Sequence, residues 1–480
     1  MLLSLLAIPV YVNFLGLEAY GVVGFFISLS LLLNFLDLGL GSTLVRHLAK
    51  NCITASQNRI RRDTVRTFEC VYAVIALVIG LSIFAITTPL ANQWIQPDSL
   101  DRKEIAIALA IAGFSLCCQW PSNLYTLGLT GLQRDVHLGY ATIFLSTLRT
   151  VLTVCAIWLY PTLHSFFLAQ LLSSVVQTIV LRLMLWKAIA TIDNHRPMIR
   201  LKIIKSSFNF ASGMTGIAIT SIFLTQIDKI ILSRILSLTD FGIYSVASSL
   251  ATAPYMLISP IHSVMYPRFA SLIEVKSTIK LTEMYHLSSQ ALGVLVIPFA
   301  ILISLYSHNF LSIWTSNNQL ASRGALILSF LVIGNACNGL MNMPYALQIA
   351  SGWTRLALLT NVWAILILSP AIWWAGTTYG AIGGAMIWML LNLGYILVTP
   401  NLMHQRLLTT EKFHWYKYGI IVPICISVGV LFVLFQFQIT ELSTVFFIFL
   451  IAVYWIITIT VCMFFLPLSK KLFSISNKST

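Results

Sequence analysis

The sequence predicts an all-α polytopic membrane protein with about 14 transmembrane helices. We expect two six-helix lobes related by an internal repeat, followed by a C-terminal helix pair. Hydrophobic residues make up 58% of the 480 residues and charged residues only 9%, whereas soluble domains carry about 25% charged residues. The apolar runs are also long enough to cross a bilayer, which takes roughly 20 helical residues. A stretch near the N-terminus recurs in the second half of the chain, which indicates duplication.

The expected spans are apolar runs separated by short polar connectors. They lie at roughly 1–15, 20–45, 68–88, 105–128, 138–160, 165–187, 207–227, 241–267, 286–306, 324–345, 355–376, 378–400, 418–437 and 443–467. The first run is short for a span, so it either begins inside a helix or packs as a short tilted one. We expect no cleavable signal peptide, because no charged segment precedes the apolar residues at Met1.

The repeat is visible as a gapless alignment of Phe14–Ala49 with Ile235–Ala270, with eight identities in 36 positions. Tyr20-Gly21 in the first copy stands against Phe241-Gly242 in the second. The offset carries the second span onto the eighth, six spans later, so both halves enter the membrane in the same direction. Such halves are related by an axis along the membrane normal, with the working cavity between them.

This repeat predicts the domain organisation. We expect an N-terminal six-helix lobe at 1–187, a basic linker at 188–205, a C-terminal six-helix lobe at 206–400, and a connector, helix pair and tail at 401–480.

Lys and Arg are distributed unevenly over the connectors. Of the 29, 22 fall in one alternating set of connectors and 5 in the other, with Arg149 and Arg182 inside spans. The positive-inside rule therefore predicts that both termini are cytoplasmic. The net charge of +14 lies in short connectors, which favours attraction to anionic headgroups of the bilayer over nucleic acid as a partner.

Several classes of activity lack their sequence signatures. The chain has no Gly-rich phosphate loop followed by Lys-Ser/Thr, and its nine His residues are not spaced as metal ligands. Most of the eight cysteines lie inside apolar runs, which predicts neither disulfides nor a metal site. The predicted external connectors reach only about 16 residues. We therefore expect no cofactor, no metal and no enzymatic activity.

Arg149 is the first candidate for the working cavity. It lies near the middle of the fifth span, where a charge costs about 2.5–3.5 kcal/mol even on a lenient scale. A guanidinium facing a wet cavity would bind an anion such as a pyrophosphate, while the structural alternative is an Arg paired with a carboxylate or with backbone carbonyls. Asp37 could pair with Arg149, bind a coupling proton or cation, or hydrogen-bond locally at the Gly39–Gly41 break, and we favour the last.

A second polar group lies at the end of the seventh span. Gln226, Asp228 and Arg234 are candidates for lining the cavity, with an interfacial anchor as the equal alternative. Asp228 and Lys229 are adjacent and point about 100° apart on a helix, so we expect no direct pair. For Arg182, near the end of the sixth span, we expect snorkelling to the headgroups.

The connector after the second span is rich in arginine. The simplest role for these arginines is to determine the membrane topology. Their second possible role is to bind an anionic lipid headgroup at the cytoplasmic entry. The entry candidates are Arg46, Arg59, Arg61 and Arg62.

Two stretches resemble bacterial polysaccharide biosynthesis proteins of the O-antigen flippase type, within the multidrug/oligosaccharidyl-lipid/polysaccharide exporter superfamily. The first runs from Leu2 to Lys50 and carries the turn at Gly16–Gly21, then Asp37-Leu38-Gly39-Leu40-Gly41 and Arg46. The second, QIDKIILSRILSLTDFGIYSVASSL, matches through Gln226, Asp228, Arg234, Gly242 and Tyr244. The remainder of the chain matches only in hydropathy and span count. Where the family often has a basic residue, this chain has Asn13.

The resemblance implies two six-helix lobes around a cationic cavity. It also implies that an undecaprenyl-pyrophosphate-linked oligosaccharide is turned from the inner to the outer leaflet of the bacterial cytoplasmic membrane. A polysaccharide polymerase and a chain-length regulator are the implied partners. Two alternatives stay open, a cation-coupled multidrug or toxin extrusion antiporter and a peptidoglycan lipid II flippase.

Overall fold

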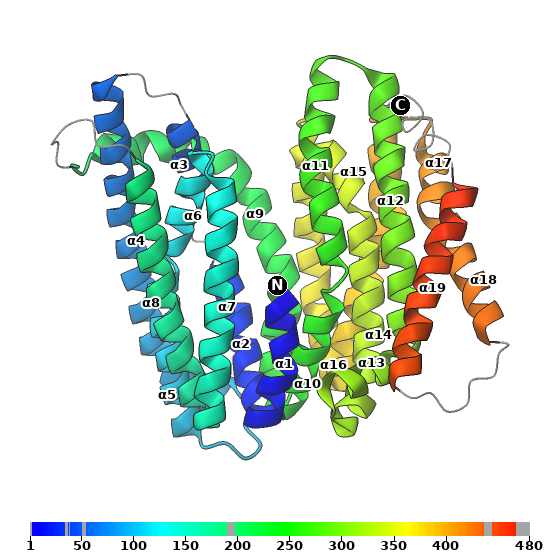
Figure 1. Ribbon diagram of the computed structural model, residues 1–480, viewed down its shortest axis with the longest axis horizontal. Coiled ribbons are helices and arrows are strands. Elements are labelled where there is room, and N and C mark those ends of the chain that lie inside the picture. The colour runs from blue at the N-terminus through cyan, green and yellow to red at the C-terminus, as the bar shows by residue number, and fades with distance from the viewer. Residues whose placement is uncertain are drawn as a thin grey trace. The chain divides into compact units, whose positions relative to one another are not determined.

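Helices form the regular structure of the described residues in this computed structural model (Figure 1). The structure describes residues 2–33, 37, 39–49, 54–189, 197–435 and 444–466. The chain divides into two compact units, Met1–Ser245 and Val246–Thr480. The predicted boundaries at 187 and 206 stay a prediction, and the predicted linker 188–205 lies partly outside the described residues.

The first unit is a bundle in which α5 packs on α4 and α8, α7 packs on α8, and α3 packs on α6. A π-helical turn, Leu90–Trp94, extends α4. The helices are α1 (Leu2–Leu15), α2 (Leu17–Leu33), α3 (Leu40–Ala49), α4 (Ala55–Pro89), α5 (Arg102–Gln119), α6 (Ser122–Gly131), α7 (Asp135–Leu159), α8 (Leu163–Ala188), α9 (Leu201–Ile235) and the start of α10 (Leu238–Ala251).

At the centre of the second unit, α14 packs on both α12 and α16. Its helices are the end of α10, α11 (Tyr255–Glu274), α12 (Thr278–Leu305), α13 (Ser307–Thr315), α14 (Asn318–Leu340), α15 (Asn342–Ala350), α16 (Thr354–His404), α17 (Lys412–Tyr416), α18 (Val422–Phe435) and α19 (Thr444–Phe465). A π-helical turn, Lys417–Ile421, precedes α18.

Several predicted spans are broken helices, which corrects the sequence analysis. The stretch 20–45 divides into α2 and α3, with Gly39 at φ +74° before α3. The stretch 105–128 divides into α5 and α6 before Ser122, and 241–267 divides into α10 and α11, which are bent by 47°. The hydropathy of a segment indicates whether it can lie in lipid, but it does not indicate whether the backbone hydrogen bonds of the helix are continuous. Hydropathy therefore cannot predict where a helix breaks.

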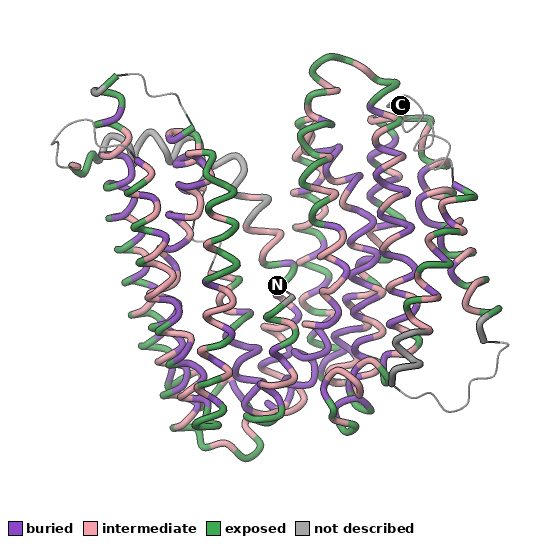
Figure 2. The backbone as a smooth tube through the Cα atoms, in the orientation of Figure 1, coloured by how far each residue is buried: buried purple, intermediate pink, exposed green. Residues whose placement is uncertain are grey.

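The protein is a multi-pass membrane protein. Among the described residues, eight helices are long and apolar enough to cross a membrane, or nine if the bent pair α10–α11 forms one span, and three shorter helices are also apolar. The count of 14 stays a prediction. Large apolar side chains such as Leu81, Phe144 and Ile367 are exposed, as expected where lipid is the solvent. Figure 2 shows exposed and buried residues alternating along the helices of both units.

The offset of the repeat, which carries Phe14 onto Ile235, also relates the observed helix ends. α2 begins at Leu17 and α10 at Leu238, and α5 ends at Gln119 and α14 at Leu340. α7 ends at Leu159, and α16 breaks at Gly380, where φ is +63° and ψ −144°. The break lies between the predicted spans 355–376 and 378–400. The repeat therefore extends well beyond the stretch that aligns in sequence.

α2 and α10 cross at very close range. A Cβ on Gly21 would lie 2.3 Å from the carbonyl oxygen of Leu238, and a Cβ on Gly242 would lie 2.1 Å from the carbonyl oxygen of Leu17. A Cβ on Gly24 would lie 2.2 Å from the Ser245 hydroxyl oxygen. Glycine at these positions is what lets the two backbones touch, as in small-residue packing between membrane helices.

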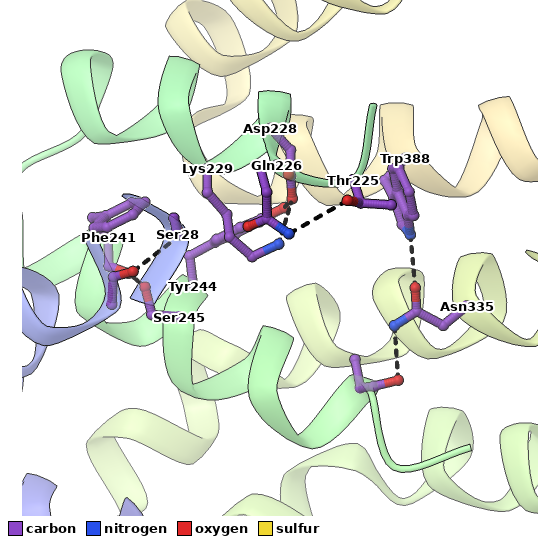
Figure 3. Close-up of polar contacts among 12 residues, drawn as sticks. Ser28, Thr225, Gln226, Asp228, Lys229, Phe241, Tyr244, Ser245, Asn335 and Trp388 are labelled. Carbon is purple, nitrogen blue, oxygen red and sulfur yellow. Dashed lines mark hydrogen bonds and ion pairs between the residues drawn. The ribbon is translucent and has the colours of Figure 1, made fainter. Parts of the chain in front are cut away.

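A buried amide network closes the break between α10 and α11 within the second unit (Figure 3). Asn335 of α14 donates to the carbonyl of Ala251, the last residue of α10, at 2.7 Å. Trp388 of α16 donates to the Asn335 side-chain oxygen at 2.9 Å. A carbonyl freed by a helix break has no water to bond in a bilayer, so Asn335 supplies its donor.

Candidate functional site

Asp37 acts as a local clamp at the start of α3. Its Oδ2 accepts the backbone N–H of Gly41 at 3.2 Å, and the hydroxyl of the buried Tyr72 on α4 donates to its Oδ1. Its carboxylate therefore bonds the first turn of α3 and Tyr72 rather than Arg149. This is the geometry expected for the local role that the sequence analysis favoured, since an acidic side chain satisfies the free N–H groups at a helix start.

Arg149 points into the first unit from α7. Its Nη2 donates to Oε1 of Gln177 on α8 at 2.7 Å, and Gln177 in turn donates to the Ser122 hydroxyl of α6 at 3.5 Å. Tyr11 of α1 lies beside it. Within the described residues, the side chain of Arg149 thus bonds a neutral amide. This bond holds the guanidinium in place and does not neutralise its positive charge.

Gln226 and Asp228 of α9 are buried, and Figure 3 shows them close to Lys229 and Tyr244. Tyr244 of α10 donates to Asp228 Oδ2 at 2.5 Å, and Lys229 Nζ lies 3.5 Å from the same oxygen. The expectation that Asp228 and Lys229 do not pair is wrong, because the long lysine side chain curls back across the angle between neighbouring positions. Among the described residues, Gln226 Oε1 and Asp228 Oδ1 are buried and have no hydrogen-bond partner.

Arg234 lies in the last turn of α9, apart from Asp228. Its backbone carbonyl accepts the side-chain amide of Gln96 at 2.9 Å, and the neighbouring Ser233 accepts from Trp94 at 3.0 Å. This end of α9 is therefore fixed by the segment that follows α4.

The arginines of the predicted cytoplasmic entry have different surroundings. Arg46 and Arg59 are exposed. Arg61 donates to the carbonyl of Leu48 at 2.8 Å and so holds the end of α3 against α4. The guanidinium carbon of Arg62 lies 5.9 Å from the ring centroid of Trp186 on α8, which is a cation–π distance.

Sequence reasoning missed Glu69, whose side chain is only 6% exposed. Its carboxylate accepts from Arg66 at 3.0 Å, from Tyr125 at 3.1 Å, from Arg182 at 2.9 Å and from Trp186 at 2.8 Å. Arg182 thus pairs with a carboxylate while its side chain remains 46% exposed, and its snorkelling to the headgroups stays a prediction. The available signal was a single carboxylate at the start of the apolar run 68–88, since such charges are expensive and need partners.

A second missed carboxylate, Asp63, is fully buried one and a half turns before Glu69. Arg200 pairs with its Oδ2 at 2.7 Å, and the backbone N–H of Met198 donates to its Oδ1 at 2.8 Å. The Arg200 backbone N–H also donates to Thr67 at 2.9 Å. These bonds attach the segment before α9 to α4.

Comparison with known proteins places the chain in a family. The family described as polysaccharide biosynthesis protein matches residues 1–273. A Shigella flexneri protein whose name describes an O-antigen transporter is 22% identical over 382 residues, which cover 78% of this chain and 87% of that protein. The succinoglycan biosynthesis transport protein ExoT of Rhizobium meliloti (strain 1021) is 24% identical, covering 81% of this chain and 73% of that protein.

The fold is also similar to that of a solved structure. A lipid II flippase MurJ structure, in an inward closed conformation, matches with a TM-score of 0.75 and 13% identity, covering 96% of this chain and 95% of that one. At this identity the likeness concerns the fold alone. The family match covers more than half of the chain. The protein therefore belongs to the polysaccharide biosynthesis protein family.

Proposed function

We propose that this protein is a flippase for an undecaprenyl-pyrophosphate-linked oligosaccharide repeat unit. It moves the unit across the bacterial cytoplasmic membrane for assembly of O-antigen or capsule. It works by alternating access, as a transporter rather than an enzyme, and it needs no cofactor. Both termini lie in the cytoplasm, and a polysaccharide polymerase and a chain-length regulator take over the translocated unit.

The observation that carries this proposal is the unneutralised charge of Arg149. Arg149 is half-buried within a membrane-spanning helix, and an arginine in such a place is normally paired with a carboxylate, because an uncompensated charge is expensive in a low-dielectric interior. Here the recorded partner is the Gln177 amide, which orients the guanidinium and leaves its attraction for anions intact. A planar guanidinium matches the oxygens of a pyrophosphate in two-point contact.

Three further observations support the substrate class. The relatives are named for O-antigen and succinoglycan transport. Twenty-two of the 29 basic residues fall in the connectors predicted to be cytoplasmic, where an anionic lipid-linked substrate is first met. Gln226 and Asp228 add buried, unpartnered acceptor oxygens on α9, and such groups suit the hydroxyls of a sugar.

The test uses a strain whose surface polysaccharide depends on this protein. Arg149→Ala should remove the surface polysaccharide and cause lipid-linked repeat units to accumulate in the inner leaflet, while Arg149→Lys should retain part of the activity because it keeps the charge and loses the fork. Arg134→Gln, at an exposed arginine in the connector before α7, is the matched control. Normal polysaccharide in Arg149→Ala at wild-type protein levels would refute the assigned role.

The MurJ-like fold favours a second candidate, a peptidoglycan lipid II flippase. This function predicts that the chain rescues the growth of cells depleted of their lipid II flippase, and the first proposal predicts that it does not. A cation-coupled multidrug antiporter would instead lower the susceptibility of a pump-deficient strain to cationic drugs, with no change in surface glycans.

A further inference from the structure

Three arginines gather around the buried Glu69 in the first unit. Arg66 contributes Nη1 from α4, and Arg182 contributes Nε from α8, to the two oxygens of one carboxylate. Arg62 lies one turn before Arg66 on the same face of α4 and stacks on Trp186, the residue one turn beyond Arg182. Trp186 also donates to Glu69. The cluster thus connects α4 to α8 through the side chain of Glu69.

The charges of this cluster do not cancel among the described residues. Two guanidinium groups share the Glu69 carboxylate, and the third, that of Arg62, lies over Trp186. Three positive charges against one negative charge leave two in excess. Asp63, the other buried carboxylate of α4, has its own partner in Arg200 at 2.7 Å. The cluster therefore attracts anions more strongly than a neutral ion pair would.

The arginines are also accessible and held in place. The side chains of Arg66 and Arg182 are 48% and 46% exposed, although each donates to a carboxylate that is itself buried. Arg62 Nε is buried and has no hydrogen-bond partner among the described residues. The exposed parts of the two anchored guanidinium groups, with the half-buried Arg62 on the same face, offer the donors that a phosphate group requires, because phosphate has several acceptor oxygens at short spacing.

We propose that Arg62, Arg66 and Arg182 form a binding site for a lipid-borne phosphate or pyrophosphate, oriented by Glu69. The site lies toward the predicted cytoplasmic ends of α4 and α8, so it receives the ligand before Arg149 does. The lipid is either the carried pyrophosphate-linked substrate, in which case the site rests on the proposed function, or an anionic phospholipid of the bilayer. Glu69 is a positioning residue in this site, and it acts through the arginines.

The test measures binding to the full-length protein in nanodiscs, with farnesyl pyrophosphate, phosphatidylglycerol and inorganic pyrophosphate as separate probes. The double variant Arg62→Gln/Arg66→Gln should weaken binding of the lipid-borne probe about tenfold or more, since charge-assisted hydrogen bonds are being removed. The control Arg134→Gln/Arg268→Gln removes the same charge from two exposed arginines, one just before α7 and one on α11, and should change binding less than twofold.

Glu69→Gln separates orientation from simple attraction. It raises the net charge by one, so a diffuse electrostatic effect would tighten binding, whereas loss of the anchor should weaken it severalfold. Thermal stability in detergent shows whether Glu69→Gln has merely unfolded the protein. In that case the binding measurement on Arg62→Gln/Arg66→Gln decides whether the site exists.

The three probes identify the source of the ligand. An effect of Arg62→Gln/Arg66→Gln on farnesyl pyrophosphate assigns the site to the substrate, and an effect confined to phosphatidylglycerol assigns it to the bilayer. Equal loss for the control pair, or no loss for any lipid probe, would overturn the site. Because this assay involves no transport, its failure leaves the phenotype of Arg149→Ala as the separate test of the proposed function.

Discussion

Gly21 and Gly242 occupy the same position in the two copies of the repeat, and each lies against the backbone carbonyl four residues before the other. Leu17 and Leu238, which own those carbonyls, are equivalent positions of the two copies as well. The contact between α2 and α10 is therefore reciprocal, as at an interface between two copies related by a two-fold axis. A duplicated helix has been packed against its own counterpart.

Replacing either glycine by alanine should destabilise the protein. The new Cβ would lie 2.3 Å or 2.1 Å from a carbonyl oxygen, so the helices must separate, at a cost of about 1–3 kcal/mol typical of overpacking. The aggregation temperature in detergent measures the change. Gly139→Ala on α7 is the control, because nothing lies within 4 Å of its Cβ. Equal behaviour of all three variants would contradict the close crossing.

Asp37→Asn should retain most of the transport activity. The amide oxygen can still accept from Gly41 or Tyr72, and a role in fixing α3 does not require the charge. Asp37→Ala should lower stability by about 0.5–2 kcal/mol, the usual effect of losing a helix cap. Surface polysaccharide and thermal stability are measured together. Loss of export in Asp37→Asn at unchanged stability would instead point to a coupling role for the carboxylate.

Gln177→Glu should reduce transport by about tenfold without unfolding the protein. A carboxylate at this position would pair with Arg149 and cancel the charge that attracts the substrate, and a close pair in a low-dielectric site is strong. Gln170→Glu adds the same charge on α8, where the native amide bonds Thr153, and should have a smaller effect. The initial rate of substrate translocation in proteoliposomes is the measurement, and equal rates would exclude the idea.

Asn335→Ala should destabilise the second unit by about 1–3 kcal/mol. It leaves the Ala251 carbonyl and the Trp388 N–H without their partners in a buried environment, where an unpaired polar group costs most. Asn342→Ala is the control, since its side chain bonds the carbonyls of Asn338 and Gly339 in the preceding turn. Thermal unfolding in detergent compares the two, and a milder effect at Asn335 would count against the network.

The sequence was sufficient for the features that depend on periodicity and composition. Apolar run lengths predicted a helical membrane protein, and a weak match around Gly21 and Gly242 predicted a repeat whose offset recurs in the helix ends. Gly39 and Gly41 indicated the break before α3. The sequence could not reveal the break after α10, because an apolar run looks the same whether or not its backbone bonds are continuous. The ion pair of Arg182 was missed for a related reason. Its partner Glu69 lies 113 positions away, and only the packing of α8 on the bundle brings them together.

The close crossing of α2 and α10 limits where the chain can be cut into two fragments that are expressed separately. Leu238–Ser245 belong to the second copy by ancestry, yet they complete the first unit. A polypeptide that stops at 187 would expose the face of α2 that carries Gly21 and Gly24, so independent expression of an ancestral half would invite self-pairing. A fragment reaching Ser245 keeps the part of α10 that covers this face.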